Sequence, residues 1–290
     1  MGYTHSLNDY SLFFKKSVSS IVLLAVYVDD IILTGDDEAE ILALKAFLDG
    51  HFKIKDLGTL NYFLGIEVSY FPSGLLLHQH KFISDLLLEY HCSEVAPVVS
   101  PLDLTQKLKA GVGDLLPKPE QFRSLIGFFQ HLSQFLQSPR VSHVAAALHL
   151  LRYLKGTSDM GVFFEDSSDL SLTTYCDSDW AACPNTRRSI TGFSIFLGGS
   201  LIGWKSKKQP MVSLSSAEAE YKVVSKVFAE LAWVARLLDD LNVSVASPPL
   251  TLTLTTHGYK MSTVQNAHLK VVDEAPLQLQ MWWYDLGKDG

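Results

Sequence analysis

Residues 21–33 read IVLLAVYVDDIIL, two apolar β-prone runs on either side of the adjacent acids Asp29 and Asp30. This pattern predicts a hairpin whose tight turn carries both acids out of an otherwise buried sheet. Because an ionised Asp is costly to bury alone, a divalent ion such as magnesium is one expected neutraliser, and it suits phosphoryl transfer in a two-metal arrangement. The simpler alternative is a polar turn, since Asp is a favoured turn residue.

The signature Tyr27-Val28-Asp29-Asp30 resembles the polymerase motif of reverse transcriptases. The ordered series that follows, residues 31–35, 52–58 and 62–67, resembles the Pol polyprotein of copia-type LTR retrotransposons, and the resemblance runs to about residue 254. It implies RNA-directed DNA synthesis on a template-primer, with magnesium as cofactor. On this resemblance Asp29 and Asp30 are candidate catalytic and metal-binding residues, and Tyr27 is a candidate nucleic-acid contact.

Length and composition indicate a globular protein of about two domains. The chain has 290 residues, of which 47% are hydrophobic and 19% charged, enough to bury sizeable cores. The net charge of -7 excludes a protein whose whole surface binds nucleic acid, so any such binding must rest on local basic clusters.

Cysteine usage and hydropathy bear on the compartment. The three cysteines form no CxxC pair, which favours a reduced intracellular compartment, cytoplasmic or nuclear, and argues against structural zinc. The N-terminus shows no signal-peptide pattern, and the apolar run at 21–28 is far shorter than a bilayer requires, so we expect no membrane segment.

The first hundred residues predict strands and helices in a palm-like order. Strands are expected over 3–35, then a helix capped by Asp36 or Asp37, a second hairpin at 61–78 around the turn 71–74, and an amphipathic helix at about 81–90. Residues 95–119 are rich in Pro, Gly and Ser and predict an extended linker. Helical periodicity resumes at Glu120.

Residues 122–127 and 148–156 resemble the thumb and connection helices of the copia-type family. The family normally carries a longer helical stretch after the counterpart of Gly127, so we expect this helical pair to close incompletely on a duplex.

A second constellation begins at residue 171. The pattern predicts a strand that ends on Asp177, a hairpin at 190–197 and 200–204 joined by Gly198-Gly199, and a helix at 215–241. The helix face expected to be apolar comprises Ala217, Tyr221, Val224, Phe228, Leu231, Ala235 and Leu238. Residues 175–181, 191–193 and 215–221 resemble the ribonuclease H domain that follows the reverse transcriptase in copia-type elements, which implies cleavage of RNA in an RNA/DNA hybrid.

Two glutamates in that helix are candidates for one catalytic role. Residues two apart on a helix point about 200° apart, so both cannot face the first strand. Glu218 stands three residues after Ser215, the spacing of a capping box, whereas Glu220 lies nearer the apolar face and matches the family's catalytic Glu. Asp177 and Glu220 are therefore the candidate catalytic and metal-binding pair, with Glu218 as the alternative; Asp179 can equally be a solvated turn residue.

Basic residues gather between the strand and the helix. Arg187, Arg188, Lys205, Lys207 and Lys208 are candidate contacts to the phosphates of a hybrid, because Lys and Arg give affinity without reading sequence. The alternative is a solvated loop.

Each centre is expected to lack a carboxylate. The family's upstream palm Asp would precede this chain, and the strand at 250–254 runs into Thr255-Thr256-His257-Gly258 where the family carries a third ribonuclease H carboxylate. We thus expect an α+β and α/β protein: a palm remnant at 1–103, linker and thumb/connection-like helices at 104–156, an incomplete ribonuclease H-like domain at 157–254 and an unmatched tail at 255–290. Its expected function is that of a fragment inactive alone, for which other Pol segments are possible partners; the alternative is a catalytically silent binding or interaction module.

Overall fold

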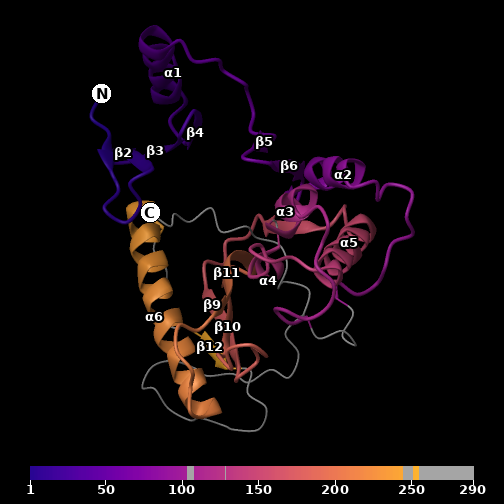
Figure 1. Ribbon diagram of the computed structural model, residues 1–290. Helices are drawn as coiled ribbons and strands as arrows, with labels where there is room; N and C mark the ends of the chain where they lie inside the picture. Colours follow the sequence, from indigo (N-terminus) through magenta and orange to yellow (C-terminus); the bar gives the residue numbers. More distant parts are fainter. Residues whose placement is uncertain (103–107, 128, 244–250, 255–290) are drawn as a thin grey trace.

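The computed structural model describes residues 1–102, 108–127, 129–243 and 251–254 (Figure 1). Within these residues the strands form three four-stranded sheets. No helix in the described ranges is long and apolar enough to cross a membrane.

The first sheet is an antiparallel meander in the order β1-β2-β3-β4. Its strands are β1 (Thr4–His5), β2 (Leu12–Lys16), β3 (Ile21–Tyr27) and β4 (Asp30–Gly35). Helix α1 (Glu38–Phe52) follows, and the Asp37 side chain accepts a hydrogen bond from the Glu40 backbone N–H. This confirms the predicted N-cap, which satisfies one of the free N–H groups at the helix start.

The second sheet joins segments that are distant in the sequence. It has the order β5-β6-β7-β8, where β5 is Tyr62–Phe63, β6 Ile66–Phe71, β7 Gly74–His78 and β8 Gly161–Glu165. The hairpin β6–β7 was predicted, and the pairing of β8 with β7 was not. This sheet therefore spans the boundary expected between residues 156 and 157.

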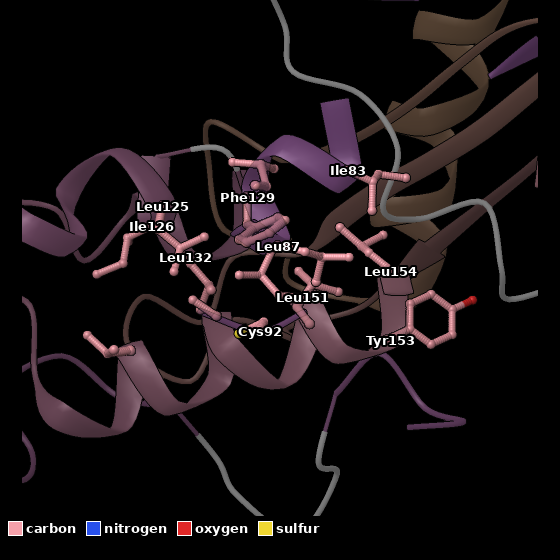
Figure 2. Packing of buried hydrophobic residues seen from close by; sticks show 14 of the residues in the cluster. Ile83, Leu87, Cys92, Leu125, Ile126, Phe129, Leu132, Leu151, Tyr153 and Leu154 are labelled. Carbon is pink, nitrogen blue, oxygen red and sulfur yellow. The ribbon is translucent and has the colours of Figure 1, made fainter. Parts of the chain in front are cut away.

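Four helices pack around one hydrophobic core. They are α2 (His80–Glu89), α3 (Glu120–Gly127), α4 (Gln130–Ser133) and α5 (Val141–Gly156). Figure 2 shows the buried side chains that they share, including Ile83, Leu125, Leu132 and Leu151. Helix α5 begins seven residues before the predicted segment 148–156, because the Arg140 backbone N–H donates to His143 Nδ1 and closes the helix start.

The third sheet has the order β11-β10-β9-β12. Strands β9 (Leu172–Asp179), β10 (Ile190–Leu197) and β11 (Ser200–Lys208) are antiparallel, and β12 (Thr251–Leu254) is parallel to β9. Gly198 and Gly199 turn β10 into β11 with φ angles of 54° and 82°, a left-handed backbone that glycine adopts without a Cβ penalty.

Helix α6 (Ser216–Asp240) covers one face of this sheet. Its buried stripe is Ala219, Val223, Val227, Leu231, Val234 and Leu238. The predicted face was correct for Leu231 and Leu238, which are buried, and for Val224, which packs against this core. It was wrong for the aromatic residues, since Tyr221 is 59% exposed and Phe228 37% exposed. Small and β-branched residues allow the helix to approach the strands closely, and the aromatic residues lie outside the contact.

The first sheet contacts the end of α6 (Figure 1). Ser6 Oγ and Asn8 Nδ2 both donate to Asp240 Oδ2, at 2.5 and 2.9 Å, and Trp233 Nε1 donates to the Asn8 carbonyl at 2.8 Å. The hairpin that carries the paired aspartates therefore belongs to a sheet anchored to α6 by polar contacts.

Candidate functional site

Asp29 and Asp30 lie at the tip of a hairpin, as predicted. Strand β3 ends at Tyr27 and β4 begins at Asp30, and these two residues pair, leaving Val28 and Asp29 as the turn. Both acids are exposed. The catalytic role expected for them stays a prediction.

The turn holds Val28 in an unusual backbone conformation. Val28 has φ of 52°, in the left-handed region that β-branched residues rarely enter, and its side chain is 83% exposed. Such a conformation costs about 1–2 kcal/mol and persists only where the surroundings impose it. Here the flanking strands impose it, because their pairing is continuous from Val22 with Gly35 to Tyr27 with Asp30.

Glu220 and Asp177 are brought together where β9 meets the first turns of α6. The Ser178 backbone N–H donates to the Glu220 carboxylate. Burial, followed by repulsion from the Asp177 charge, raises the pKa of Glu220 from 4.5 to about 7. Glu220 Oε2 is buried and has no hydrogen-bond partner among the described residues. Burial, followed by the charges of Glu220 and Asp177, also raises the pKa of the Cys176 thiol to about 12.

Glu218 points instead toward the helix start. Its Oε2 accepts a 2.8 Å hydrogen bond from the Leu214 backbone N–H, and its Oε1 forms a 2.7 Å ion pair with Lys222. The Glu218 backbone N–H donates to Ser215 Oγ. These contacts are those of a capping residue, and they lower the pKa of Glu218, with the Lys222 bond as the largest cause.

A buried hydrogen-bond network, which no sequence pattern indicated, lies beside the carboxylate pair. Gln209 Nε2 donates to Thr191 Oγ1 and to the Ala219 carbonyl, at 3.2 and 3.0 Å, and lies 3.4 Å from Ser178 Oγ. Ser213 Oγ donates to Gln209 Oε1 at 3.0 Å. The network ties the start of α6 to β9 and β10, next to Asp177 and Glu220. A single Gln carries no sequence signal of such a role.

The oxygen atoms of Asp177 and Glu220 are the candidate ligands for magnesium at this site. Magnesium prefers an octahedron of oxygen ligands and keeps several waters. The buried, unpartnered Glu220 Oε2 beside Asp177 is an available oxygen donor. However, the described part of the chain contains no group of three His, Cys, Asp or Glu residues that could hold a metal. The pair therefore suits at most one weakly held ion, and the described residues do not fit a two-ion centre.

The predicted basic residues lie on β11 and in the loop between β9 and β10, and their contact with nucleic acid stays a prediction. Lys205 pairs with Glu230 of α6, whereas Lys208 Nζ donates to Gln134 Oε1 at 3.0 Å. Arg187 and Arg188 are exposed in the loop between β9 and β10.

Lys208 has a second neighbour in that loop, the buried thiol of Cys183. Burial raises the pKa of this thiol, but hydrogen bonds from Thr186, Lys208 and the Thr186 and Asn185 backbone outweigh it and bring the pKa to about 7.

A pocket of about 660 Å³ lies between the second and third sheets. Its lining is mainly apolar and includes Leu77, Tyr153, Phe164 and Trp204. None of its lining residues is a predicted site residue.

Comparison with known proteins assigns the first part of the chain to a family. Residues 1–103 match the family described as reverse transcriptase (RNA-dependent DNA polymerase). No solved structure matches the chain significantly.

Several curated proteins are similar over most of the chain. The Retrovirus-related Pol polyprotein from transposon RE2 of Arabidopsis thaliana is 36% identical over 86% of this chain and 18% of its own length. The Pol polyprotein from transposon TNT 1-94 of Nicotiana tabacum is 30% identical over 83% of this chain and 20% of its own. An uncharacterized mitochondrial protein of Arabidopsis thaliana is 39% identical over 72% of this chain and 93% of its own. The chain thus spans about a fifth of the Pol polyproteins that it matches.

Proposed function

This chain belongs to the Pol polyprotein family of copia-type retrotransposons, and on that premise we propose that it is a reverse transcriptase and ribonuclease H fragment that binds RNA/DNA hybrids without catalysing phosphoryl transfer alone. Residues 1–103 are a palm remnant, residues 104–156 a linker with thumb/connection-like helices, and residues 157–254 an incomplete ribonuclease H-like domain. Residues 255–290 have no assigned role. The pairing of β8 with β7 joins the palm remnant to the later part of the chain through one sheet.

The observation that carries the proposal is the arrangement of the third sheet and α6. Three antiparallel strands are followed by a long helix and a strand parallel to the first, with Asp177 on that first strand and Glu220 on the helix. The Asp177 charge acts directly on Glu220, whereas Glu218 serves the helix start. This supports a ribonuclease H-like assignment and Glu220, rather than Glu218, as the partner of Asp177.

The first sheet supports the palm assignment. Its exposed hairpin presents Asp29 and Asp30 side by side on a strained turn, next to the partly exposed ring of Tyr27. Backbone strain of this kind clusters at functional sites and supports a role for the tip beyond chain reversal.

The proposed lack of independent catalysis rests on the carboxylates. Magnesium, when bound, would polarise a phosphoryl oxygen and activate the attacking group. Among the described residues neither acidic centre gathers three potential ligands, so neither fits two ions. Glu220 can hold a proton near neutral pH. Exposed lysines and arginines can attract phosphates.

The direct test uses the purified 290-residue chain with magnesium, a labelled RNA/DNA hybrid and a labelled template-primer. We expect hybrid binding that weakens steeply with salt, with no primer extension and no hybrid cleavage. Asp177→Asn and Asp29→Asn serve as controls for trace activity. Magnesium-dependent cleavage by the wild type that is abolished by Asp177→Asn would contradict the proposed inactivity.

A second candidate function is hybrid cleavage completed by another Pol segment. It is favoured by Glu220 Oε2, a buried oxygen without a hydrogen-bond partner among the described residues. Its test adds the upstream part of a copia-type Pol polyprotein to this chain. Cleavage that requires both chains and Asp177 would support it, and cleavage unaffected by Asp177→Asn would exclude it.

A further inference from the structure

Lys205 and Lys207 lie on the face of the third sheet that α6 covers. Lys205 pairs with Phe193 and Lys207 pairs with Thr191 across β10 and β11. Phe193 packs in the core beneath α6, and directly paired residues share a face of the sheet. Lys208, the next residue, lies on the opposite face and contacts Gln134.

Helix α6 adds a third lysine to this face. Lys205 Nζ lies 3.3 Å from Glu230 Oε1, which fixes where α6 meets β11. Lys226 precedes Glu230 by one helical turn, so the two side chains share a face of α6. Burial and the charges of Lys205 and Lys207 lower the pKa of Lys226. Three ammonium groups therefore converge from two elements.

The described contacts of the three lysines include one ion pair, that of Lys205 with Glu230. The cross-strand partners Phe193 and Thr191 are uncharged. Lys222, one turn before Lys226, forms an ion pair with Glu218. Gathering like charges costs free energy, which an anionic ligand would offset.

The position of the lysines relates them to the carboxylate pair. Lys207 pairs with Thr191, and Thr191 pairs with Ser178, whose backbone N–H donates to Glu220 and which follows Asp177 directly. Lys207 and Ser178 thus lie in one cross-strand row, two strand spacings or about 10 Å apart. That separation corresponds to about three base steps along a duplex axis.

We infer that Lys205, Lys207 and Lys226 form a binding site for the phosphodiester backbone of a nucleic acid, a few nucleotides from Asp177 and Glu220. This inference rests on the proposed hybrid binding and adds Lys226, which no sequence pattern singled out. The site reads no base sequence, because ammonium groups contact phosphates without base recognition.

The test measures binding of the full chain to a fluorescent RNA/DNA hybrid by anisotropy between 50 and 200 mM salt. Lys226→Ala and Lys207→Ala are compared with Arg236→Ala, an exposed residue of the same helix that removes the same charge. Lys226→Arg keeps the charge. Glu230→Gln removes the local acid. Thermal unfolding of each variant verifies that it is folded.

We expect Lys226→Ala and Lys207→Ala to weaken binding equally for hybrids of two unrelated sequences. Each should reduce the slope of log affinity against log salt concentration by about one, so that the fall in affinity between 50 and 200 mM salt becomes about fourfold smaller. Lys226→Arg should restore the slope, Arg236→Ala should leave it unchanged, and Glu230→Gln should tighten binding.

Two results would overturn the site, and they are distinguishable. If the wild type binds the hybrid and both lysine variants match Arg236→Ala, this site is wrong and hybrid binding stands. If the wild type binds no hybrid even at 50 mM salt, the proposed function fails and the site fails with it.

Discussion

Glu220 of α6 accepts a hydrogen bond from the Ser178 backbone N–H of β9, and burial together with repulsion from the neighbouring Asp177 carboxylate raises the pKa of Glu220 to about 7. A carboxyl whose pKa lies near neutral holds a proton that an ordinary Glu would have lost. This relationship makes the region sensitive to pH and to cations in ways that can be measured without any catalytic activity.

The Glu220 pKa predicts a pH-dependent effect of Glu220→Gln. The folded chain keeps the proton up to about pH 7, whereas the unfolded chain releases it near pH 4.5, so this group's stabilising contribution is present below pH 4.5 and lost as the pH rises through 7. Glutamine cannot ionise. We expect the free energy of unfolding of the variant to exceed that of the wild type by roughly 1 kcal/mol at pH 8, a value already reduced for solvent screening. At pH 4.5 the two free energies should differ little.

Glu218→Gln is the matched control for this measurement by urea unfolding. The pKa of Glu218 is lowered, chiefly by Lys222, so its contribution is present at neutral pH and is lost as the pH falls through the folded pKa. This variant should be less stable than the wild type at pH 8. If both glutamine variants change stability in the same direction at pH 8, the opposite roles assigned to the two glutamates are wrong.

Gln209→Ala should destabilise the third sheet. The change leaves the Ala219 carbonyl and the Thr191 and Ser213 hydroxyls without the amide that they contact, and a buried unsatisfied polar group costs about 1–3 kcal/mol. Urea unfolding measures the loss. Gln134→Ala removes the same side chain from an exposed position and should change the free energy by less than about 0.5 kcal/mol. Equal effects of the two changes would show that the buried network adds no stability.

Val28→Gly should leave stability unchanged or raise it by up to about 1 kcal/mol, because glycine adopts a φ of 52° without a Cβ penalty. Val26→Gly, two residues earlier and paired with Ile31, is the control and should be destabilising. Hydrogen exchange of the β3 and β4 amides reports both. A clear loss of protection in Val28→Gly would show that the Val28 side chain, rather than its backbone, matters to the hairpin.

Local patterns predicted most of the elements, and non-local contacts were missed. The hairpin around Asp29 and the cap by Asp37 depend on neighbours in the sequence and were predicted correctly. The pairing of Gly161 with His78 joins distant segments, and a five-residue strand gives no local sign of its partner.

The candidate site shows the same division. The spacing of Ser215 and Glu218 identified the helix start, whereas the apolar face of α6 was predicted only in part, because the large aromatic residues Tyr221 and Phe228 were counted as core. Lys226 could not be found from sequence, since its significance comes from β11, which packs beside it only in the folded chain.

Asp240→Ala should loosen the first sheet from α6. The Asp240 carboxylate accepts hydrogen bonds from Ser6 and Asn8. Both bonds lower the pKa of Asp240, and the bond from Ser6 has the larger effect. The anchor is therefore present at neutral pH and is lost as the pH falls through the folded pKa. We expect faster hydrogen exchange in β1 and β2 of the variant at pH 7, and a smaller difference from the wild type in acid. Asp239→Ala is the control, because its contact with Lys16 uses the backbone carbonyl and survives the change. Equal exchange rates in the two variants would mean that the Asp240 side chain does not hold the sheet.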